Sequence, residues 1–205
     1  MNIYEMHFGS WKKKKVSENP GFENHGYNAC GLHNIYEGDG VEEVWYRYEE
    51  MAEVLIPYLK DMGYTHVELL PLCEHPLDES WGYQSTGFFA PTSRYGTCDG
   101  LKSFVNACHN AGIGVILDFV MVHFATDDYG LNHFDGSELY EMPESDVTLS
   151  EWGSYNFFHA KGEVASFLKS CVDYWINDYH FDGLRFDAIS NIIYWRGRQE
   201  CGVNR

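Results

Sequence analysis

Basic side chains are scarce in this sequence. Its 205 residues hold 14 Lys and Arg against 31 Asp and Glu, which gives a formal net charge of −17. Binding to nucleic acid or to an anionic membrane surface requires a basic face that displaces counterions. The composition therefore argues against nucleic acid and membrane as partners and leaves a neutral ligand open.

Long apolar runs and paired cysteines are also missing. No apolar stretch approaches the roughly 20 residues that a transmembrane helix needs. The six cysteines, at positions 30, 73, 98, 108, 171 and 201, form no CxxC pair, which favours reduced thiols over a disulfide framework or a metal site. The first residues, MNIYEMHFGSWKKKK, place charge after the apolar part, unlike a secretory signal. We expect a cytoplasmic protein.

Aromatic residues, by contrast, are abundant. Fifteen Tyr, 13 Phe and 6 Trp make up 17% of the chain. They suit either a thick hydrophobic core or a surface that stacks flat apolar ligands such as sugar rings. At this length the chain can bury a sizeable core, as one domain or as part of a larger one.

Apolar runs predict four strands, at residues 2–8, 65–72, 113–120 and 183–189. The third run is almost continuously apolar, as expected of a strand that is covered on both faces. Between the first two strands, the lysine-rich segment 12–40 is expected to be a loop with solvated lysines.

Helical spacing of apolar residues predicts three helices between these strands. The first begins at Val44 and ends at Gly63, with a kink or a restart near Ile56, caused by Pro57. The second covers residues 100–111, with Asp99 as its N-cap and Gly112 as its stop. The third covers residues 163–179.

This alternation implies an α/β fold with parallel strands joined by right-handed crossovers. A doubly wound sheet and a (β/α)8 TIM barrel both satisfy it. The barrel is favoured because no Gly-rich phosphate loop follows the first strand, and because polar groups recur where the third and fourth strands end. We expect residues 1–205 to be an incomplete barrel domain, made of the first four βα units and without a C-terminal β domain.

The stretch FDGLRFDAISN, residues 181–191, holds an arginine and an aspartate two positions apart in an apolar run. A strand projects Arg185 and Asp187 onto one face, and a carboxylate in such a run needs a compensating group. The guanidinium favours the ionised carboxylate, which suits a nucleophile. A structural ion pair explains the same two residues equally well.

Asp118 is a second carboxylate within an apolar strand, in VILDFVMVHF. His123 follows beyond the strand end, where a structural histidine and a ligand contact are both open. Trp81 and Tyr83, in the loop WGYQSTGFFAP, either offer a flat face to a sugar or pack within the loop.

Together these motifs resemble the α-amylase family, glycoside hydrolase family 13. DFVMVH at 118–123 and GLRFDA at 183–188 resemble its first and second signature regions. The stretches NIYEMHFGSWK, HVELLPLCEHPLDESWGYQSTGFFAPTSRYG and EWGSYNFFHAKGEVASFL are similar to 1,4-α-glucan branching enzymes. GYQ at Gly82 to Gln84 and FAPTSRYG at Phe89 to Gly96 distinguish these from general amylases.

The resemblance implies a role for each matching residue. Asp187 matches the nucleophile that forms a covalent glycosyl enzyme, and Arg185 matches the arginine that holds this nucleophile ionised. A second group is expected to bind the sugar at the cleavage subsite: Tyr83, which stacks on the ring, with Asp118 and His123. Trp81 and Gln84 are also expected to bind the substrate.

The implied reaction transfers a 1,4-α-glucan segment to the 6-hydroxyl of another glucan chain, making an α-1,6 branch without a metal or organic cofactor. The chain departs from the family at Phe119 and Met121, where tryptophan and proline are common. The family's general acid is a glutamate after the fifth strand, which no residue here matches, so we expect the isolated chain to be inactive. A hydrolase of the same family and a non-catalytic glucan-binding half-barrel are the alternatives.

Overall fold

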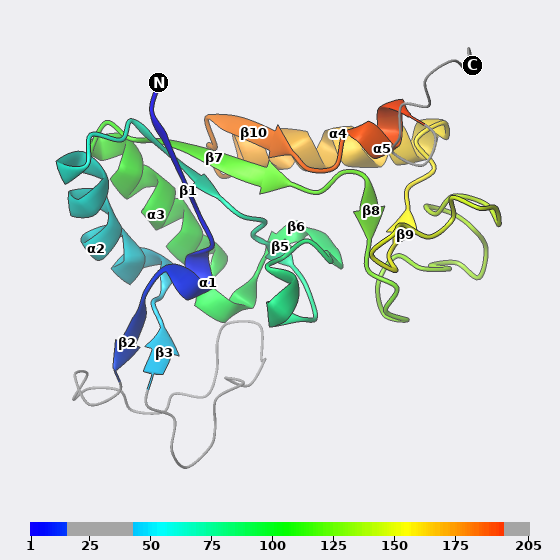
Figure 1. The fold of residues 1–205 in the computed structure, drawn as a ribbon, viewed down its shortest axis with the longest axis horizontal. Coiled ribbons are helices and arrows are strands. Elements are labelled where there is room, and N and C mark those ends of the chain that lie inside the picture. The colour runs from blue at the N-terminus through cyan, green and yellow to red at the C-terminus, as the bar shows by residue number, and fades with distance from the viewer. Residues whose placement is uncertain (16–42, 195–205) are drawn as a thin grey trace.

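The structure is a computed structural model that describes residues 1–15 and 43–194. Its centre is a four-stranded parallel sheet in which each strand lies beside the next one along the chain (Figure 1). The strands are β1 (Ile3–Met6), β4 (His66–Leu69), β7 (Gly114–Phe119) and β10 (Gly183–Phe186). The α/β character and the four parallel strands agree with the sequence pattern.

Three helices connect these strands: α2 (Tyr48–Asp61), α3 (Cys98–Asn110) and α4 (Gly162–Asn177). Their apolar stripes are buried in one core with alternate residues of the strands. Leu55, Phe104 and Trp175 of the helices and Val67 and Leu117 of the strands are all 0% exposed. The helical and strand periodicities of the sequence therefore meet in a single hydrophobic core.

Three short antiparallel pairs extend from this unit. They are β2 (Lys13–Lys15) with β3 (Glu43–Trp45), β5 (Cys73–Glu74) with β6 (Gly87–Pro91), and β8 (His123–Phe124) with β9 (Tyr155–Asn156). The β8–β9 pair lies at the opposite end of the molecule from β2–β3 (Figure 1). Four single turns complete the order: α1 (Phe8–Trp11), η2 (Asp78–Ser80), η3 (Ser93–Tyr95) and α5 (Ser190–Ile193).

The lysine run differs from its expected solvated loop. Lys14 pairs with Val44 in the β2–β3 ladder, and its ammonium lies 2.6 Å from the Glu50 carboxylate. Because Val44 lies in strand β3, the predicted helix start at Val44 is wrong, and α2 begins at Tyr48. The rest of that predicted loop, 16–42, lies outside the described residues.

Two details of the helix ends also differ from prediction. Helix α2 continues through Pro57 as one helix, without a restart. The N-cap of α3 is Thr97, whose hydroxyl accepts a hydrogen bond from the Gly100 amide at 3.1 Å, whereas Asp99 lies within the first turn. Gly112 follows the helix with φ of +75°, which confirms it as the stop.

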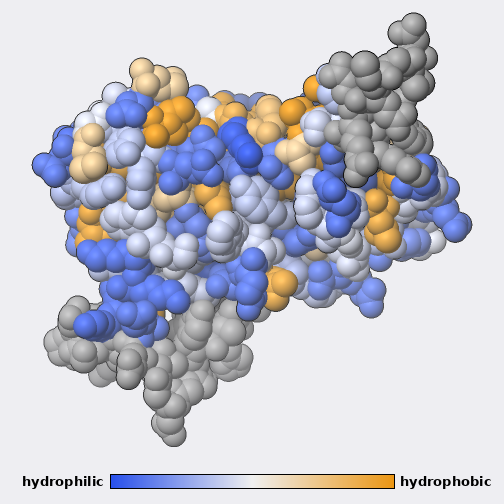
Figure 2. Space-filling view, in the orientation of Figure 1, coloured by the Kyte–Doolittle hydropathy of each residue, from blue (hydrophilic) through white to orange (hydrophobic). Residues whose placement is uncertain are grey.

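The two outer strands of the sheet expose hydrophobic side chains. Figure 2 shows hydrophobic side chains along the upper edge, where Figure 1 places β1 and β10, and Ile3 and Phe186 of these strands are 40% and 39% exposed.

Cys73, Cys98, Cys108 and Cys171 are free thiols, while Cys30 and Cys201 lie outside the described residues. Within the described ranges, no cluster of His, Cys, Asp or Glu could hold a metal ion, and no helix could span a membrane.

Candidate active site

One guanidinium joins two carboxylates where β7 and β10 end. Strand pairing places Arg185 beside Asp118. The Arg185 Nη1 donates to Asp118 Oδ2 at 2.7 Å and to Asp187 Oδ1 at 2.8 Å. Strand β10 ends at Phe186, three residues before the predicted end, so Asp187 lies just beyond the strand and Ala188 adopts φ of +47°.

Tyr83 reaches this ion-pair cluster through its hydroxyl group. The phenol donates a hydrogen bond to Asp118 Oδ2 at 2.7 Å, on the oxygen that also accepts from Arg185. Burial, and then this hydrogen bond, raise the pKa of Tyr83 well above its ordinary value. Tyr83 is therefore a neutral donor at physiological pH, a role distinct from the ring stacking that the resemblance implies.

Asp118 is the most deeply buried member of the cluster. It is 1% exposed, and its Oδ1 has no hydrogen-bond partner in the described part of the chain. Burial raises the pKa of Asp118 even though Tyr83 and Arg185 both donate to the carboxylate. Burial also lowers the pKa of Arg185, but the hydrogen bond and charge of Asp118 outweigh it and hold that pKa above its ordinary value. Such perturbed groups gather at functional sites.

His123 lies in β8, just beyond the cluster, and is 2% exposed. Burial lowers the pKa of His123 to about 4, although the charge of Asp187 acts in the opposite direction. The imidazole is therefore neutral at pH 7 and can both donate and accept a hydrogen bond. Its ring packs at 5.3 Å, centroid to centroid, against Trp152.

Two other predicted site residues form no hydrogen bond with the described residues of the cluster. The Trp81 ring stacks on His7, with centroids 5.9 Å apart and planes at 25°, and Trp81 is 53% exposed. Gln84 is half-buried and makes no hydrogen bond within the ranges described. The structure thus joins Tyr83 directly to the ion-pair cluster, and leaves Trp81 and Gln84 elsewhere on the same loop.

Comparison with known proteins adds a second kind of observation. The model of the family described as alpha amylase, catalytic domain, matches residues 53–148. The 1,4-alpha-glucan branching enzyme GlgB of Nitrosospira multiformis is 49% identical over 95% of this chain and 23% of its own length. GlgB 2 of Clostridium perfringens is 46% identical over 98% of this chain and 26% of its own length. The chain is a homologue of the branching enzymes in the α-amylase family.

The chain spans about a quarter of the length of these branching enzymes. Two solved structures share its fold. The α-amylase of Geobacillus thermoleovorans superposes with a TM-score of 0.68 at 21% identity, covering 91% of this chain and 39% of that chain. The Anoxybacillus α-amylase superposes with a TM-score of 0.66 at 20% identity, covering 90% and 40%. At these identities the likeness concerns the fold.

The chain holds a further carboxylate that the sequence motifs do not single out. Glu68 of β4 pairs with Glu5 of β1 across the sheet. Burial, followed by the charges of Glu5 and Asp118, raises the pKa of Glu68. Glu68 stands in the apolar run HVELL, so the signal that identified Asp118, a carboxylate inside an apolar strand, also applies to it.

A cavity of about 590 Å³ lies between the 142–160 loop and α5. Its lining includes Val122, the residue before His123 in the chain, together with Leu149, Phe158 and Tyr194. Tyr83, Asp118, Arg185 and Asp187 do not line it. Its size is typical of a ligand pocket, but it does not contain the ion-pair cluster.

Proposed function

We propose that this chain is the part of a 1,4-α-glucan branching enzyme that carries the nucleophile, built as the first four βα units of a (β/α)8 barrel. Strands in sequential spatial order suit a barrel, because a doubly wound sheet reverses its order at a switch point. The cluster lies where β7 and β10 end, the position that barrel enzymes use for catalysis. In this proposal residues 1–205 are an incomplete catalytic domain.

The observation that carries the proposal is the bridge made by Arg185. A carboxylate nucleophile must be ionised, and the guanidinium at 2.8 Å from Asp187 Oδ1 stabilises the negative charge. Asp187 is also partly open to solvent, with a side chain 23% exposed, whereas Asp118 is 1% exposed. Asp187 is therefore the more accessible of the two carboxylates.

In the first step a carboxylate oxygen of Asp187 bonds to the anomeric carbon of an α-1,4-glucan, and the bond from this carbon to the leaving oxygen breaks. The leaving oxygen takes a proton from a general acid, which we assign to no residue of this chain. In the second step the 6-hydroxyl of another glucan attacks the same carbon, gives its proton to the conjugate base of that general acid, and breaks the bond to Asp187. The new linkage is α-1,6.

The other residues would hold the sugar at the cleavage subsite. Neutral His123 has a ring nitrogen to donate to a sugar hydroxyl, and buried Asp118 offers a carboxylate acceptor. Tyr83 contributes its ring face while its hydroxyl holds Asp118. Trp81 and Gln84 would meet a longer glucan on the same loop. This chemistry calls for no cofactor, nucleic acid or membrane, and suits a cytoplasmic polymer.

Substitution of the nucleophile tests the proposal in the full-length protein that carries this sequence. Asp187→Ala should reduce the formation of new 1,6 linkages from amylose by at least about 10³-fold, since no covalent intermediate can form. The exposed Asp178→Ala, on the end of α4, is the matched control and should keep wild-type activity. Unchanged branching by Asp187→Ala would refute the assignment and favour a glucan-binding role. Release of reducing sugar alone would favour hydrolysis over transfer.

A further inference from the structure

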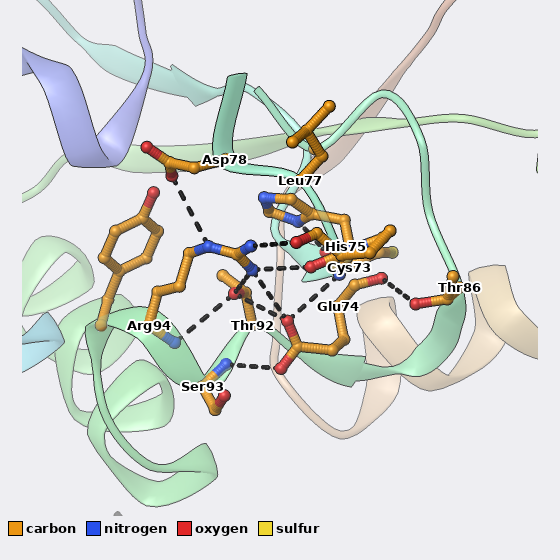
Figure 3. A network of polar contacts seen from close by, with 12 residues as sticks. Cys73, Glu74, His75, Leu77, Asp78, Thr86, Thr92, Ser93 and Arg94 are labelled. Atoms are coloured by element: carbon orange, nitrogen blue, oxygen red, sulfur yellow. Dashed lines mark hydrogen bonds and ion pairs between the residues drawn. The ribbon is translucent and has the colours of Figure 1, made fainter. Parts of the chain in front are cut away.

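A polar network lies at the base of the loop that carries Tyr83 (Figure 3). Glu74, at the end of β5, is its centre. The Glu74 Oε1 accepts from Arg94 Nη1 at 3.1 Å and from the Thr92 hydroxyl at 3.0 Å, and Oε2 accepts from the Ser93 amide at 2.9 Å. Thr92 is 0% exposed and the Glu74 side chain is 26% exposed, so the network extends from the protein interior to its surface.

Arg94 connects this centre to the first residues of the loop. Its Nη1 donates to the His75 carbonyl at 2.7 Å, its Nη2 donates to the Pro76 carbonyl at 3.2 Å, and its Nε lies 3.5 Å from Asp78 Oδ1 (Figure 3). The Arg94 side chain is only 6% exposed. A rigid fork of donors that meets several acceptors at once is a contact that lysine cannot reproduce.

The same centre also holds the far end of the loop. The Thr86 amide donates to the Glu74 carbonyl at 2.9 Å, and the Ser85 hydroxyl donates to the Gly82 carbonyl at 3.0 Å. Tyr83 lies between these fixed ends, and its hydroxyl reaches Asp118 at 2.7 Å. The loop from His75 to Ser85 contains no β-strand; its own turns and the side-chain contacts of Arg94 hold its course.

We propose that Arg94 is a positioning residue for the reaction: by fixing the carbonyls of His75 and Pro76, it places the Tyr83 hydroxyl on Asp118. Misplacement of a site group by about 1 Å can cost about 10²-fold in rate. Arg94 itself touches none of the reacting atoms. The inference rests on the proposed function only for its kinetic readout, and a second readout is independent of activity.

The kinetic test is a double-mutant cycle of Arg94→Lys and Tyr83→Phe in the full-length protein. In the Tyr83 background, Arg94→Lys should lower kcat/KM by about 10-fold or more. In the Tyr83→Phe background, where the hydroxyl is absent, the same change should cost less than about 2-fold. Equal losses in both backgrounds would overturn the inference, because Arg94 would then act independently of Tyr83.

The activity-independent test is hydrogen exchange of the loop amides, followed by mass spectrometry of peptides spanning 77–86. The amides of Ser80, Trp81, Tyr83 and Thr86 donate to backbone carbonyls in the structure. Arg94→Lys should speed their exchange by at least about 10-fold. Thr97→Ala, which removes the N-cap of α3, is the control for general destabilisation and should leave both loop exchange and kcat/KM at wild-type values.

The two readouts separate the possible failures. If the wild-type protein makes no α-1,6 linkages, the proposed function fails and loop exchange alone decides the role of Arg94. Unchanged loop exchange in Arg94→Lys would overturn the inference whatever the activity. Faster exchange in Thr97→Ala to the same extent would also overturn it, because Arg94 would then be an ordinary stabilising residue.

Discussion

Asp118 accepts from two donors on one oxygen and from none of the described groups on the other. Its burial disfavours the charged carboxylate, which is why its pKa is raised. A carboxyl group whose pKa is higher in the folded protein than in the unfolded chain reduces the stability of the fold at neutral pH. We therefore expect Asp118 to serve the proposed site and not the stability of the fold.

Asp118→Asn should separate activity from stability. The neutral amide removes the desolvation cost, and Arg185 keeps Asp187 as its partner, so the thermal midpoint should stay within about 3 °C of wild type, a change of about 1 kcal/mol for a chain of this size. Branching activity should fall by about 10²-fold or more, measured on amylose in the full-length protein. Residual activity within about 2-fold of wild type, or a large drop in midpoint, would contradict this view of Asp118.

His123 should make the stability of the chain fall with acid. Its pKa is about 4 in the folded state and 6.5 without burial, so the unfolded chain takes up the proton first as the pH falls. The stability contributed by neutral His123 is complete above pH 6.5 and is lost as the pH falls through 4. The full loss is roughly 3 kcal/mol.

Urea unfolding between pH 4 and 7 measures this effect. His123→Gln should flatten the pH dependence, and the difference from wild type isolates His123 because burial lowers the pKa of His7 and His75 as well. His133→Gln, whose histidine side chain is 52% exposed, is the control and should follow wild type. Parallel curves for wild type and His123→Gln would show that the buried imidazole does not titrate as described.

At the scale of elements, the loop before β6 depends on a single glycine in GYQ. Gly82 has φ of +88°, and a Cβ added there would lie 2.2 Å from the Pro71 carbonyl oxygen. Both the left-handed backbone and the close approach require glycine. The next residue is Tyr83, so any shift that relieves this clash moves the hydroxyl that Asp118 accepts.

Gly82→Ala should therefore cost more than backbone strain alone. Gly63, just after α2, is the matched control, because it has φ of +77° but nothing within 4 Å of an added Cβ. Gly63→Ala should lose about 1 kcal/mol and keep activity. Gly82→Ala should lose about 2 to 3 kcal/mol more and most of its branching activity. Equal free energies of unfolding for the two variants would rule out the predicted clash.

The elements that the sequence predicts well are those in which pattern and packing agree. The stripes of α2, α3 and α4 were recognisable because each turn adds another buried residue, such as Leu55 or Trp175. The β2–β3 ladder could not be recognised from the sequence, because lysines are poor strand formers and the partner strand lies far along the chain. Thr97 was missed as N-cap because Asp99 is an equally good capping residue.

The site, too, contains some contacts that the sequence predicts and others that it does not. Arg185 and Asp187 are two residues apart, so local geometry was enough to predict their pairing. Tyr83 meets Asp118 only after the loop has folded over the C-terminal end of β7, and a sequence motif does not specify whether the ring or the hydroxyl is used. The network of Glu74 and Arg94 likewise depends on the pairing of β5 with β6.

At the scale of the whole molecule, two tendencies oppose each other. Strands β1 and β10 each pair with one neighbour in the described sheet, and both present apolar side chains to solvent. Unpaired strand edges favour association between copies. The net charge of −17 opposes it, and salt screens that repulsion.

The 205-residue chain should therefore self-associate, and more strongly as salt increases. Ile3 is 40% exposed on the edge strand β1, and a lysine there would interfere with pairing to another copy. Sedimentation velocity in 0.5 M salt should show oligomers for wild type and a shift toward monomer for Ile3→Lys. Leu77→Lys, at a 54% exposed loop position, is the control for added charge and should behave as wild type. A wild-type chain that stays monomeric at every concentration, or equal shifts for both variants, would show that the β1 edge is not the contact.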